Sequence, residues 1–222
     1  MAPVAVDHAA RKDHSERCQG PAQRRYESSP LLVVRRTSYY AVTVPPGPEP
    51  ILSLSEWMVL SLVCKGVTHG HAVTSHLARY GDLGQVWNVQ KAVVYRALDR
   101  LTDLGLIRSA GEEHTSKGPV RQLVEATDEG RTAAAAWQQQ PVQHPRDVRS
   151  ELLVKLALLD RSGTDPHDLL VAQRALLAPA AEAMPDRIAA APGFERTLLR
   201  WRYETLAATL RFLDAMLLAP GR

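Results

Sequence analysis

The stretch from 88 to 107 has apolar residues at the spacing of an amphipathic helix about four turns long. The apolar side comprises Val93, Val94, Ala97, Leu98, Leu101 and Leu104. The polar side comprises Lys91, Tyr95, Arg96, Asp99 and Thr102. Asn88 is a good N-cap, because its side-chain oxygen can accept a backbone N–H of the first turn. Gly105 is expected to end the helix in a left-handed conformation, after which Leu106 and Ile107 begin a strand.

Two further helices are predicted before this one. The first covers 53–65, begins at Ser53 or Ser55, and is apolar nearly all round, which is typical of a buried helix. The second opens at His69 and runs to about Tyr80, with apolar positions spaced to pack on the first. This order is that of a helix-turn-helix motif, so the polar side of the third helix is predicted to enter a DNA groove. The alternative is an ordinary solvated helix face.

A β-hairpin is predicted directly after the third helix. Its strands cover 106–110 and 120–126, and its tip covers 111–119. A further helix follows, with Thr127 at its start and Trp137 at its end. Three helices, a hairpin and a helix make a winged helix, and Lys117 at the tip with Arg121 beside it would lie against a phosphate backbone.

From residue 149 onward the composition shifts to Leu and Ala on helical periods. Helices are predicted at 149–160, at 165–184 and from about 193 to 218, with Asp165 capping the second and Pro179 kinking it. One apolar row of the last helix follows a spacing of 4, 3, 4, 3, 4 and comprises Leu199, Tyr203, Leu206, Leu210, Leu213 and Leu217. A second row comprises Leu198, Trp201, Thr205, Ala208, Phe212 and Ala215.

A helix with two apolar rows needs two partners. We predict that one row packs on its own domain and the other on a second subunit, and we assign the first row to dimerisation, although the pattern leaves open which row does so. The alternative is a compact three-helix domain. The predicted division is a poorly ordered tail with a proline-rich linker at 1–50, a winged helix-turn-helix DNA-binding domain at 51–140 and a helical dimerisation domain at 148–220.

The net charge of the chain says little about a partner, and only the positions of individual charged residues are informative. The chain of 222 residues has a formal net charge of +3, and residues 51–130 hold 8 basic against 9 acidic residues. Any DNA contact must therefore come from the placement of individual side chains and not from bulk charge. The strand-like segment 31–44 could be a short strand, an arm along DNA, or sequence upstream of the true start of translation.

Several classes of protein are not supported by the sequence. No apolar run or signal-peptide core suggests a membrane or secreted protein, and Cys18 and Cys64 lie in unlike contexts, so we expect a reduced, cytoplasmic protein without a disulfide. His71 and His76 are five residues apart, which is the wrong spacing for two metal ligands on one helix face, and His69 is explained as a cap. No catalytic motif or cofactor motif is present, so we expect neither an enzyme nor a bound cofactor.

Several segments together resemble the PadR-like family of transcriptional regulators. The stretch HGHAVTSHL resembles the family's second helix, and VVYRALDRLTDLGLI resembles its recognition helix and following strand. KGPVRQLVEATDEGR resembles its wing, and SELLVKLALLD with WRYETLAATLRFLD resembles the C-terminal domain of the longer members. The resemblance covers roughly 51–218. The chain departs from the pattern at His71, where an aromatic residue is usual, and in a wing with one basic residue fewer than many members have.

The resemblance implies a dimeric winged-helix protein that acts mostly as a repressor and, in some members, is released by a small aromatic ligand. Carried over by position, the DNA contacts are Gln90, Lys91, Tyr95, Arg96, Lys117 and Arg121. Tyr95 could instead be a packing residue, and Arg96 could be occupied in an ion pair with an acidic neighbour on its helix.

We therefore expect a sequence-specific DNA-binding regulator whose partners are a promoter inverted repeat and a second copy of the chain. The alternative is a winged helix used only for protein contacts, which the near-neutral charge of 51–130 supports. Four aromatic residues are candidates to line an effector cavity or, alternatively, to form plain core: Trp57, Trp137, Trp201 and Phe212.

Overall fold

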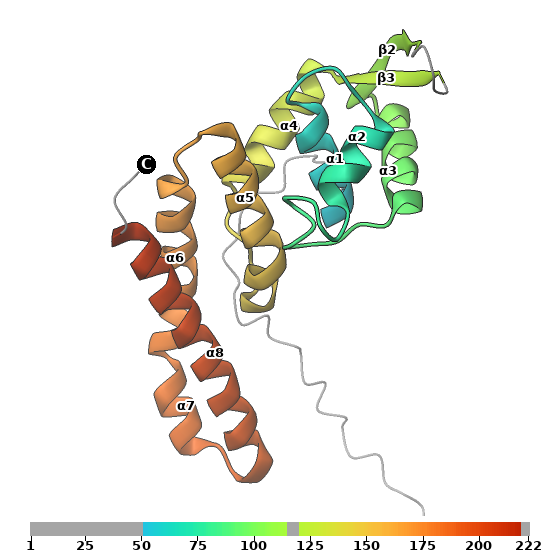
Figure 1. Ribbon diagram of the computed structural model, residues 1–222. Coiled ribbons are helices and arrows are strands. Elements are labelled where there is room, and N and C mark those ends of the chain that lie inside the picture. Colours follow the sequence, from blue (N-terminus) through green and yellow to red (C-terminus); the bar gives the residue numbers. More distant parts are fainter. Residues whose placement is uncertain (1–50, 115–119, 219–222) are drawn as a thin grey trace, which may run out of the picture. The chain divides into compact units, whose positions relative to one another are not determined.

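The computed structural model describes residues 51–114 and 120–218 (Figure 1). Their first part contains three helices, a small sheet and a fourth helix: α1 (Leu54–Val63), β1 (Thr68–His69), α2 (Gly70–Leu77), α3 (Lys91–Asp103), β2 (Ile107–Glu113), β3 (Arg121–Ala126) and α4 (Asp128–Gln139). A 3₁₀ turn, a π-helical turn and four helices follow: Pro145–Asp147, Val148–Leu152, α5 (Leu153–Ser162), α6 (His167–Glu182), α7 (Met184–Ala190) and α8 (Gly193–Leu218). The mainly helical fold, a winged helix followed by helices, is as predicted.

Side-chain caps begin three helices of the winged helix. Ser53 forms a capping box with Glu56 at the start of α1, which selects Ser53 over Ser55. His69 caps α2 as predicted, because its Nδ1 accepts the Ala72 amide at 3.1 Å. The hydroxyl of Thr127 accepts the Gly130 amide at the start of α4. Each cap pairs a backbone donor that the first helical turn leaves without an intrahelical acceptor.

The prediction that Asn88 caps α3 is wrong. The helix begins at Lys91, and its N-cap residue Gln90 makes no side-chain cap bond. The residue after Asn88, Val89, is buried, and its amide donates to the carbonyl of Leu77 at 2.9 Å. Both contacts anchor the segment before α3 to the end of α2, and the helix begins two residues later, at Lys91.

The second helix also ends earlier than predicted, at Leu77 and not near Tyr80. Its C-cap residue Ala78 is extended, with φ −68° and ψ 157°. The chain then folds back so closely that a Cβ at Gly84 would overlap the carbonyl oxygen of Ala78. This close approach requires glycine and sets the path of the turn between α2 and α3.

The wing is an antiparallel hairpin that belongs to a three-stranded sheet in the order β1-β3-β2. Strand β2 continues three residues beyond the predicted end, and Glu113 pairs with Arg121. The register shifts between Ser109 and Gly111, where φ of Gly111 is 104°. The two-residue strand β1 was not predicted, and it places His69 opposite Leu123. The residues 115–119, which include Lys117, lie outside the described part of the chain.

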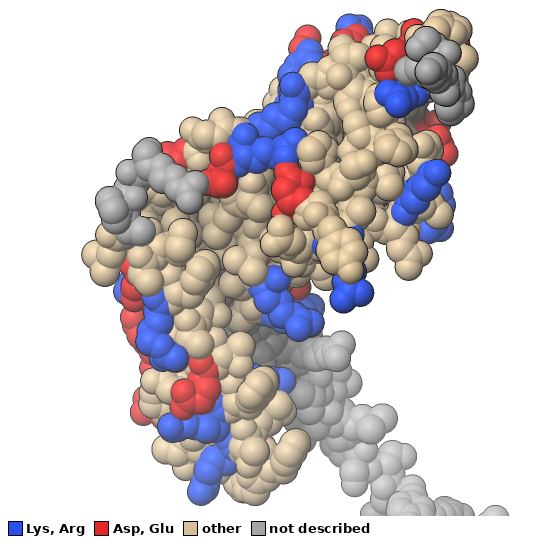
Figure 2. Space-filling view, viewed as in Figure 1, with Lys and Arg blue, Asp and Glu red and all other residues tan. Residues whose placement is uncertain are grey.

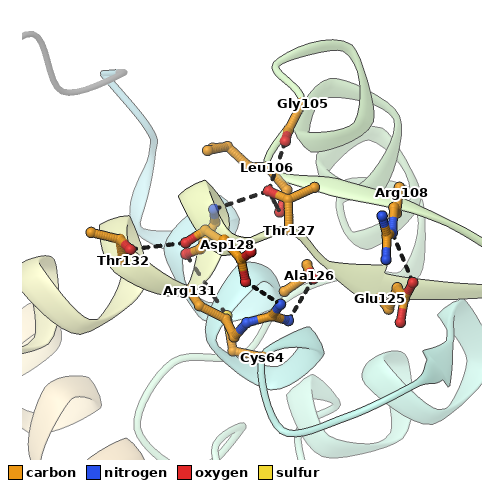
Figure 3. Close-up of polar contacts among 11 residues, drawn as sticks. Cys64, Gly105, Leu106, Arg108, Glu125, Ala126, Thr127, Asp128, Arg131 and Thr132 are labelled. Carbon is orange, nitrogen blue, oxygen red and sulfur yellow. Dashed lines mark hydrogen bonds and ion pairs between the residues drawn. The ribbon is translucent and has the colours of Figure 1, made fainter.

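Thr127 joins the hairpin to α4 (Figure 3). Its hydroxyl lies 2.8 Å from the carbonyl oxygen of Gly105 and 3.1 Å from that of Leu106. Arg131 donates to the Ala126 carbonyl and to Asp128, both at 2.6 Å. These bonds fix the base of the wing against the helix that follows it. Gly105 has φ 70°, which confirms the predicted left-handed end of α3.

One buried cluster fills the winged helix and extends into α5. It contains apolar side chains of α1, α2, α3, β2 and α4 together with Val154 and Leu158 of α5. Trp57 and Trp137 stack within it, with ring centroids 5.2 Å apart. Cys64 lies against this cluster as a free thiol, and burial raises its pKa to about 11, so the thiol is neutral at pH 7. Cys18 lies outside the described residues.

A second cluster lies between α5, α6 and α8, and Figure 1 shows α6 and α8 side by side. Helix α8 has the predicted extent, whereas α7 was not predicted as a separate helix. The carboxylate of Asp165 accepts the His167 amide at 2.9 Å, but the N-cap residue of α6 is Pro166. Pro179 lies inside α6. Because α5 contributes Leu159 to this cluster as well as Val154 to the first, it is shared between the two cores.

Polar contacts also cross from the winged helix to α5. The ammonium of Lys155, only 1% exposed, donates to the Gln140 carbonyl and to Glu151, both at 2.8 Å. Arg161 pairs with Asp82, which also binds His76. Burial alone would raise the pKa of Asp82, but His76 and Arg161 outweigh it and the pKa lies below its ordinary value. Within the described ranges, no helix is long and apolar enough to cross a membrane.

Candidate nucleic-acid interface

Helix α3 buries one face and leaves the other open. Its buried residues are Val94, Ala97, Leu98 and Leu101, as the sequence predicts. Leu104 belongs to the predicted apolar row, yet it is 44% exposed because the helix has already ended there. The predicted polar residues Lys91, Tyr95, Arg96, Asp99 and Thr102 are all exposed, and so is Gln90. The amphipathic reading of this helix is therefore confirmed.

The cations of this open face are available for a partner. In the described part of the chain, neither Lys91 nor Arg96 takes part in an ion pair, so Arg96 is not held by Asp99 or Asp103. The ammonium of Lys91 lies 5.8 Å from the centre of the Tyr95 ring. Both cations lie in the N-terminal half of α3, whereas Asp99 and Asp103 lie in the C-terminal half. The positive end of the face is thus the end that begins the helix.

Tyr95 is both a packing residue and an exposed one. Its side chain is 41% exposed, and its ring covers the backbone of Gly70 at the start of α2. A Cβ at Gly70 would lie only 2.9 Å from the ring. The ring packs on one side and is solvent-exposed on the other, so its packing leaves the hydroxyl side open to a partner. Glycine at position 70 is what lets α2 and α3 approach so closely.

Arg121 lies where β3 faces the start of α2. Its Nη1 is 3.4 Å from the Glu113 carboxylate and 3.4 Å from Nε2 of His69. The pairing of His69 with Leu123 brings these residues to one face of the sheet. The contact to His69 joins positions 52 residues apart and has no sequence signal beyond the hairpin itself. Arg121, the predicted wing contact that lies within the described residues, is therefore beside the helix-turn-helix and not isolated at a hairpin tip.

A residue that the sequence interpretation left without a role orients α3. Arg100 donates to Glu56 at 3.0 Å and to the carbonyl of Ile51 at 3.1 Å, which ties α3 to the start of α1. Burial alone would raise the pKa of the Glu56 carboxyl, but its bonds to Ser53 and the charge of Arg100 outweigh it and the pKa lies below its ordinary value. The Ser-x-x-Glu pattern at 53–56 signals the cap, but nothing in the sequence links it to Arg100.

On the face drawn in Figure 2, basic groups lie at several places over the winged helix, some of them adjoining, with acidic groups beside them. This agrees with the nearly balanced charge of 51–130. A continuous basic stripe would attract any polyanion at long range, whereas separated cations contribute mainly through direct contacts. The arrangement favours a partner that matches the positions of particular side chains.

Residues 59–136 match the family described as the transcriptional regulator PadR-like family. The negative transcriptional regulator PadR of Bacillus subtilis (strain 168) is 28% identical over 102 residues, which cover 45% of this chain and 53% of that protein. The chain thus spans about half the length of this curated relative. These descriptions are of transcriptional regulators and not of enzymes.

Two solved structures are also similar. The crystal structure of Bacillus subtilis PadR in complex with operator DNA shares 22% identity, with a TM-score of 0.39, 76% of this chain covered and 99% of the other. The structure of the same protein in complex with p-coumaric acid shares 20% identity, with a TM-score of 0.35, 74% of this chain covered and 93% of the other.

Proposed function

Because residues 59–136 place this chain in the PadR-like family of transcriptional regulators, we propose that it binds operator DNA as a homodimer and represses transcription. The observation that carries the proposal is the open face of α3, where Lys91 and Arg96 are exposed and lack ion pairs within the described residues. Cations that stay unpaired on a helix of this motif suit base edges and phosphates in a major groove. A role on promoter DNA would place the protein in the cytoplasm.

Each proposed contact has a distinct chemical task. Arg96 and Lys91 would bind guanine edges or flanking phosphates, and Gln90 would reach a neighbouring base or phosphate from the N-cap position. Tyr95 would donate its hydroxyl to a phosphate while its ring stays packed on Gly70. Arg121, together with Lys117, would contact the backbone beside the groove. The wing contacts would position the protein on the DNA, and the α3 contacts would determine which base sequence it prefers.

The exposed row of α8 would supply the subunit contact. Within one chain, the row assigned to dimerisation is partly covered already, because Leu199, Leu206 and Leu213 are buried. The second row is more open: Trp201 is 70% exposed and Leu198 is 37% exposed. Large apolar side chains in such a row favour burial against a second protein surface. We therefore move the proposed dimer contact to the second row, whose spacing from Leu198 is 3, 4, 3, 4, 3.

A cavity beside α1 and α4 would hold a small effector. Its volume is about 280 Å³, and its lining includes the stacked rings of Trp57 and Trp137. Glu151 is the charged residue of the lining, and its carboxylate accepts the Trp137 indole N–H at 3.1 Å. The same carboxylate accepts from the Lys155 ammonium at 2.8 Å, so its charge is neutralised, and the size and indole rings of the cavity suit a small flat ring. Of the four aromatic candidates, Trp201 lies elsewhere, exposed on α8.

The test is binding of the purified protein to the DNA just upstream of its own coding region, against random duplex, at two salt concentrations. We expect tight binding to a short inverted repeat, a steep loss of affinity in salt, and a dimer by light scattering. Equal, weak binding to both duplexes by a dimeric protein would overturn the proposal. It would favour the alternative of a winged helix that contacts only proteins.

A further inference from the structure

We infer that His69 and Arg121 together bind one phosphate group of the DNA backbone. This inference rests on the proposed DNA-binding function and adds a contact that the sequence did not indicate, because His69 was assigned only the role of a helix cap. It follows from the hydrogen-bonding state that the cap imposes on the imidazole ring.

The cap determines which ring nitrogen carries the proton. The Ala72 amide can only donate, so Nδ1 of His69, at 3.1 Å from it, must be the acceptor and cannot carry a hydrogen. A neutral imidazole with a bare Nδ1 has its hydrogen on Nε2. Nε2 of His69 is therefore a hydrogen-bond donor for as long as the ring caps α2.

This donor faces a second donor. Nη1 of Arg121 lies 3.4 Å from Nε2 of His69, and a guanidinium nitrogen has no lone pair to accept a hydrogen. The two groups therefore cannot bond to each other, and their N–H hydrogens are close enough for one acceptor to bind both. A phosphate oxygen is such an acceptor, because it is anionic and accepts more than one hydrogen bond.

Both groups are accessible to such a partner. His69 is half-buried, and the Arg121 side chain is 41% exposed. They lie at the start of α2, and the Tyr95 ring covers the neighbouring Gly70. Contacts thus run in sequence from Lys91 to Tyr95, Gly70, His69 and Arg121. A phosphate at His69 and Arg121 would continue the proposed α3 contacts toward the wing.

One carboxylate competes for the same arginine. Glu113 accepts from Nη1 of Arg121 at 3.4 Å, and both side chains are more than two-fifths exposed. An exposed pair of this kind is weak, so a phosphate that also accepts from His69 can displace the carboxylate. Glu113 then competes with the phosphate for Arg121. We therefore expect that removal of the Glu113 carboxylate tightens DNA binding.

The decisive variant is His69→Ser. Serine is a good N-cap and preserves the start of α2, but it removes the Nε2 donor. We expect about five- to tenfold weaker binding to both operator and random duplex, because a phosphate contact is independent of sequence. Arg121→Gln should weaken binding about tenfold and lower the salt dependence by about one phosphate, whereas Glu113→Gln should strengthen binding a few-fold.

Arg146→Gln is the matched control, because Arg146 is an exposed arginine beside Asp147 outside the winged helix. It should leave DNA affinity unchanged. If His69 and Arg121 share a phosphate, the double variant should lose less than the product of the two single losses. On duplexes in which single phosphates are replaced by neutral methylphosphonate, one position should weaken wild-type binding but no longer weaken the double variant.

His69→Ser protein that melts like wild type and binds both duplexes with wild-type affinity would overturn the inference, as would fully independent losses in the double variant. If His69→Ser does not fold, Arg121→Gln and the methylphosphonate position decide the question on their own. If wild-type protein binds without preferring the operator while the His69→Ser loss persists on both duplexes, the promoter-reading function fails and the phosphate contact stands.

Discussion

Helices α3 and α8 are both amphipathic, and both leave one face open, but the open faces differ in chemistry. On α3 that face holds Lys91 and Arg96 beside a half-packed tyrosine. On α8 it holds Phe194, 78% exposed, and Trp201, 70% exposed. Charged side chains lose little by staying in water until a phosphate arrives, whereas large apolar ones gain by burial against protein. The chemistry of the exposed side chains, more than their helical spacing, indicates what kind of partner each helix binds.

The two open faces are also supported differently. Arg100 and Glu56 hold α3 against α1 through a hydrogen-bonded ion pair, and Gly70 lets the Tyr95 ring lie close to α2. Helix α8 is held mainly by apolar packing against α6 and α7, with an exposed ion pair between Arg174 of α6 and Asp214. Local polar changes should therefore alter the DNA face, while the α8 face should respond to changes in apolar area.

The largest effect is expected from the double substitution of Leu198 and Trp201 by Glu. Two carboxylates in a buried subunit contact would oppose association, so the protein should become monomeric. Operator affinity should fall by at least about a hundredfold, because a monomer engages one half-site at a time. Light scattering and operator titration measure both. Arg211→Glu, at an exposed position of α8 outside both apolar rows, is the control, and a dimeric double variant with unchanged affinity would contradict the assignment.

Substitution of α3 cations should have the next largest effect. Arg96→Ala and Lys91→Ala should each weaken operator binding by about tenfold, corresponding to about 1.4 kcal/mol, with a smaller salt dependence. The melting temperature and the dimer should be unchanged, because neither side chain is in an ion pair within the described residues. Asp103→Ala at the far end of α3 serves as the control. Retention of full affinity in both cation variants would remove α3 from the interface.

Gly70→Ala should have a smaller effect on DNA binding. It distinguishes the role of Tyr95 placement in DNA affinity from its role in the stability of the fold. The added methyl group would lie 2.9 Å from the Tyr95 ring, which is 41% exposed, and 3.2 Å from a methyl group of the buried Leu98. We expect DNA affinity to fall several-fold, by about 1 kcal/mol, while the melting temperature changes little. Tyr95→Phe, which keeps the ring and loses the hydroxyl, shows how much of that loss belongs to the hydroxyl. A marked loss of stability with normal affinity would show that the ring only packs.

The smallest expected effect is a pH dependence of stability from Glu56. Its folded pKa lies below the ordinary value of 4.5, so its contribution is present above about pH 4.5 and is lost as the pH falls through the folded pKa. Glu56→Gln should cost about 1 kcal/mol at pH 7 and flatten the acid side of the stability curve. Thermal unfolding from pH 3 to pH 7 measures this. Equal acid sensitivity in both proteins would contradict it.

Local chemistry was sufficient to predict several elements. Ser53, Thr127 and Gly105 set helix ends through bonds or dihedral angles within a few residues, and all three lie where expected. Asn88 is an equally good N-cap by residue type, but Val89 is buried and bonded to Leu77, twelve residues away, and the helix begins at Lys91. Local rules hold where tertiary contacts do not anchor the same residues.

The amino-acid sequence by itself determined the winged-helix order, the apolar and polar sides of α3, and the extent of α8, because each rests on periodicity and caps that act within a few turns. Only the tertiary structure decided which row of α8 the chain covers, that Arg100 binds Glu56, and that His69 meets Arg121. Those contacts join residues 44 to 52 positions apart or depend on which helix packs against α8. Long-range contacts depend on how the elements pack together, and the spacing of residues within one element does not encode that packing.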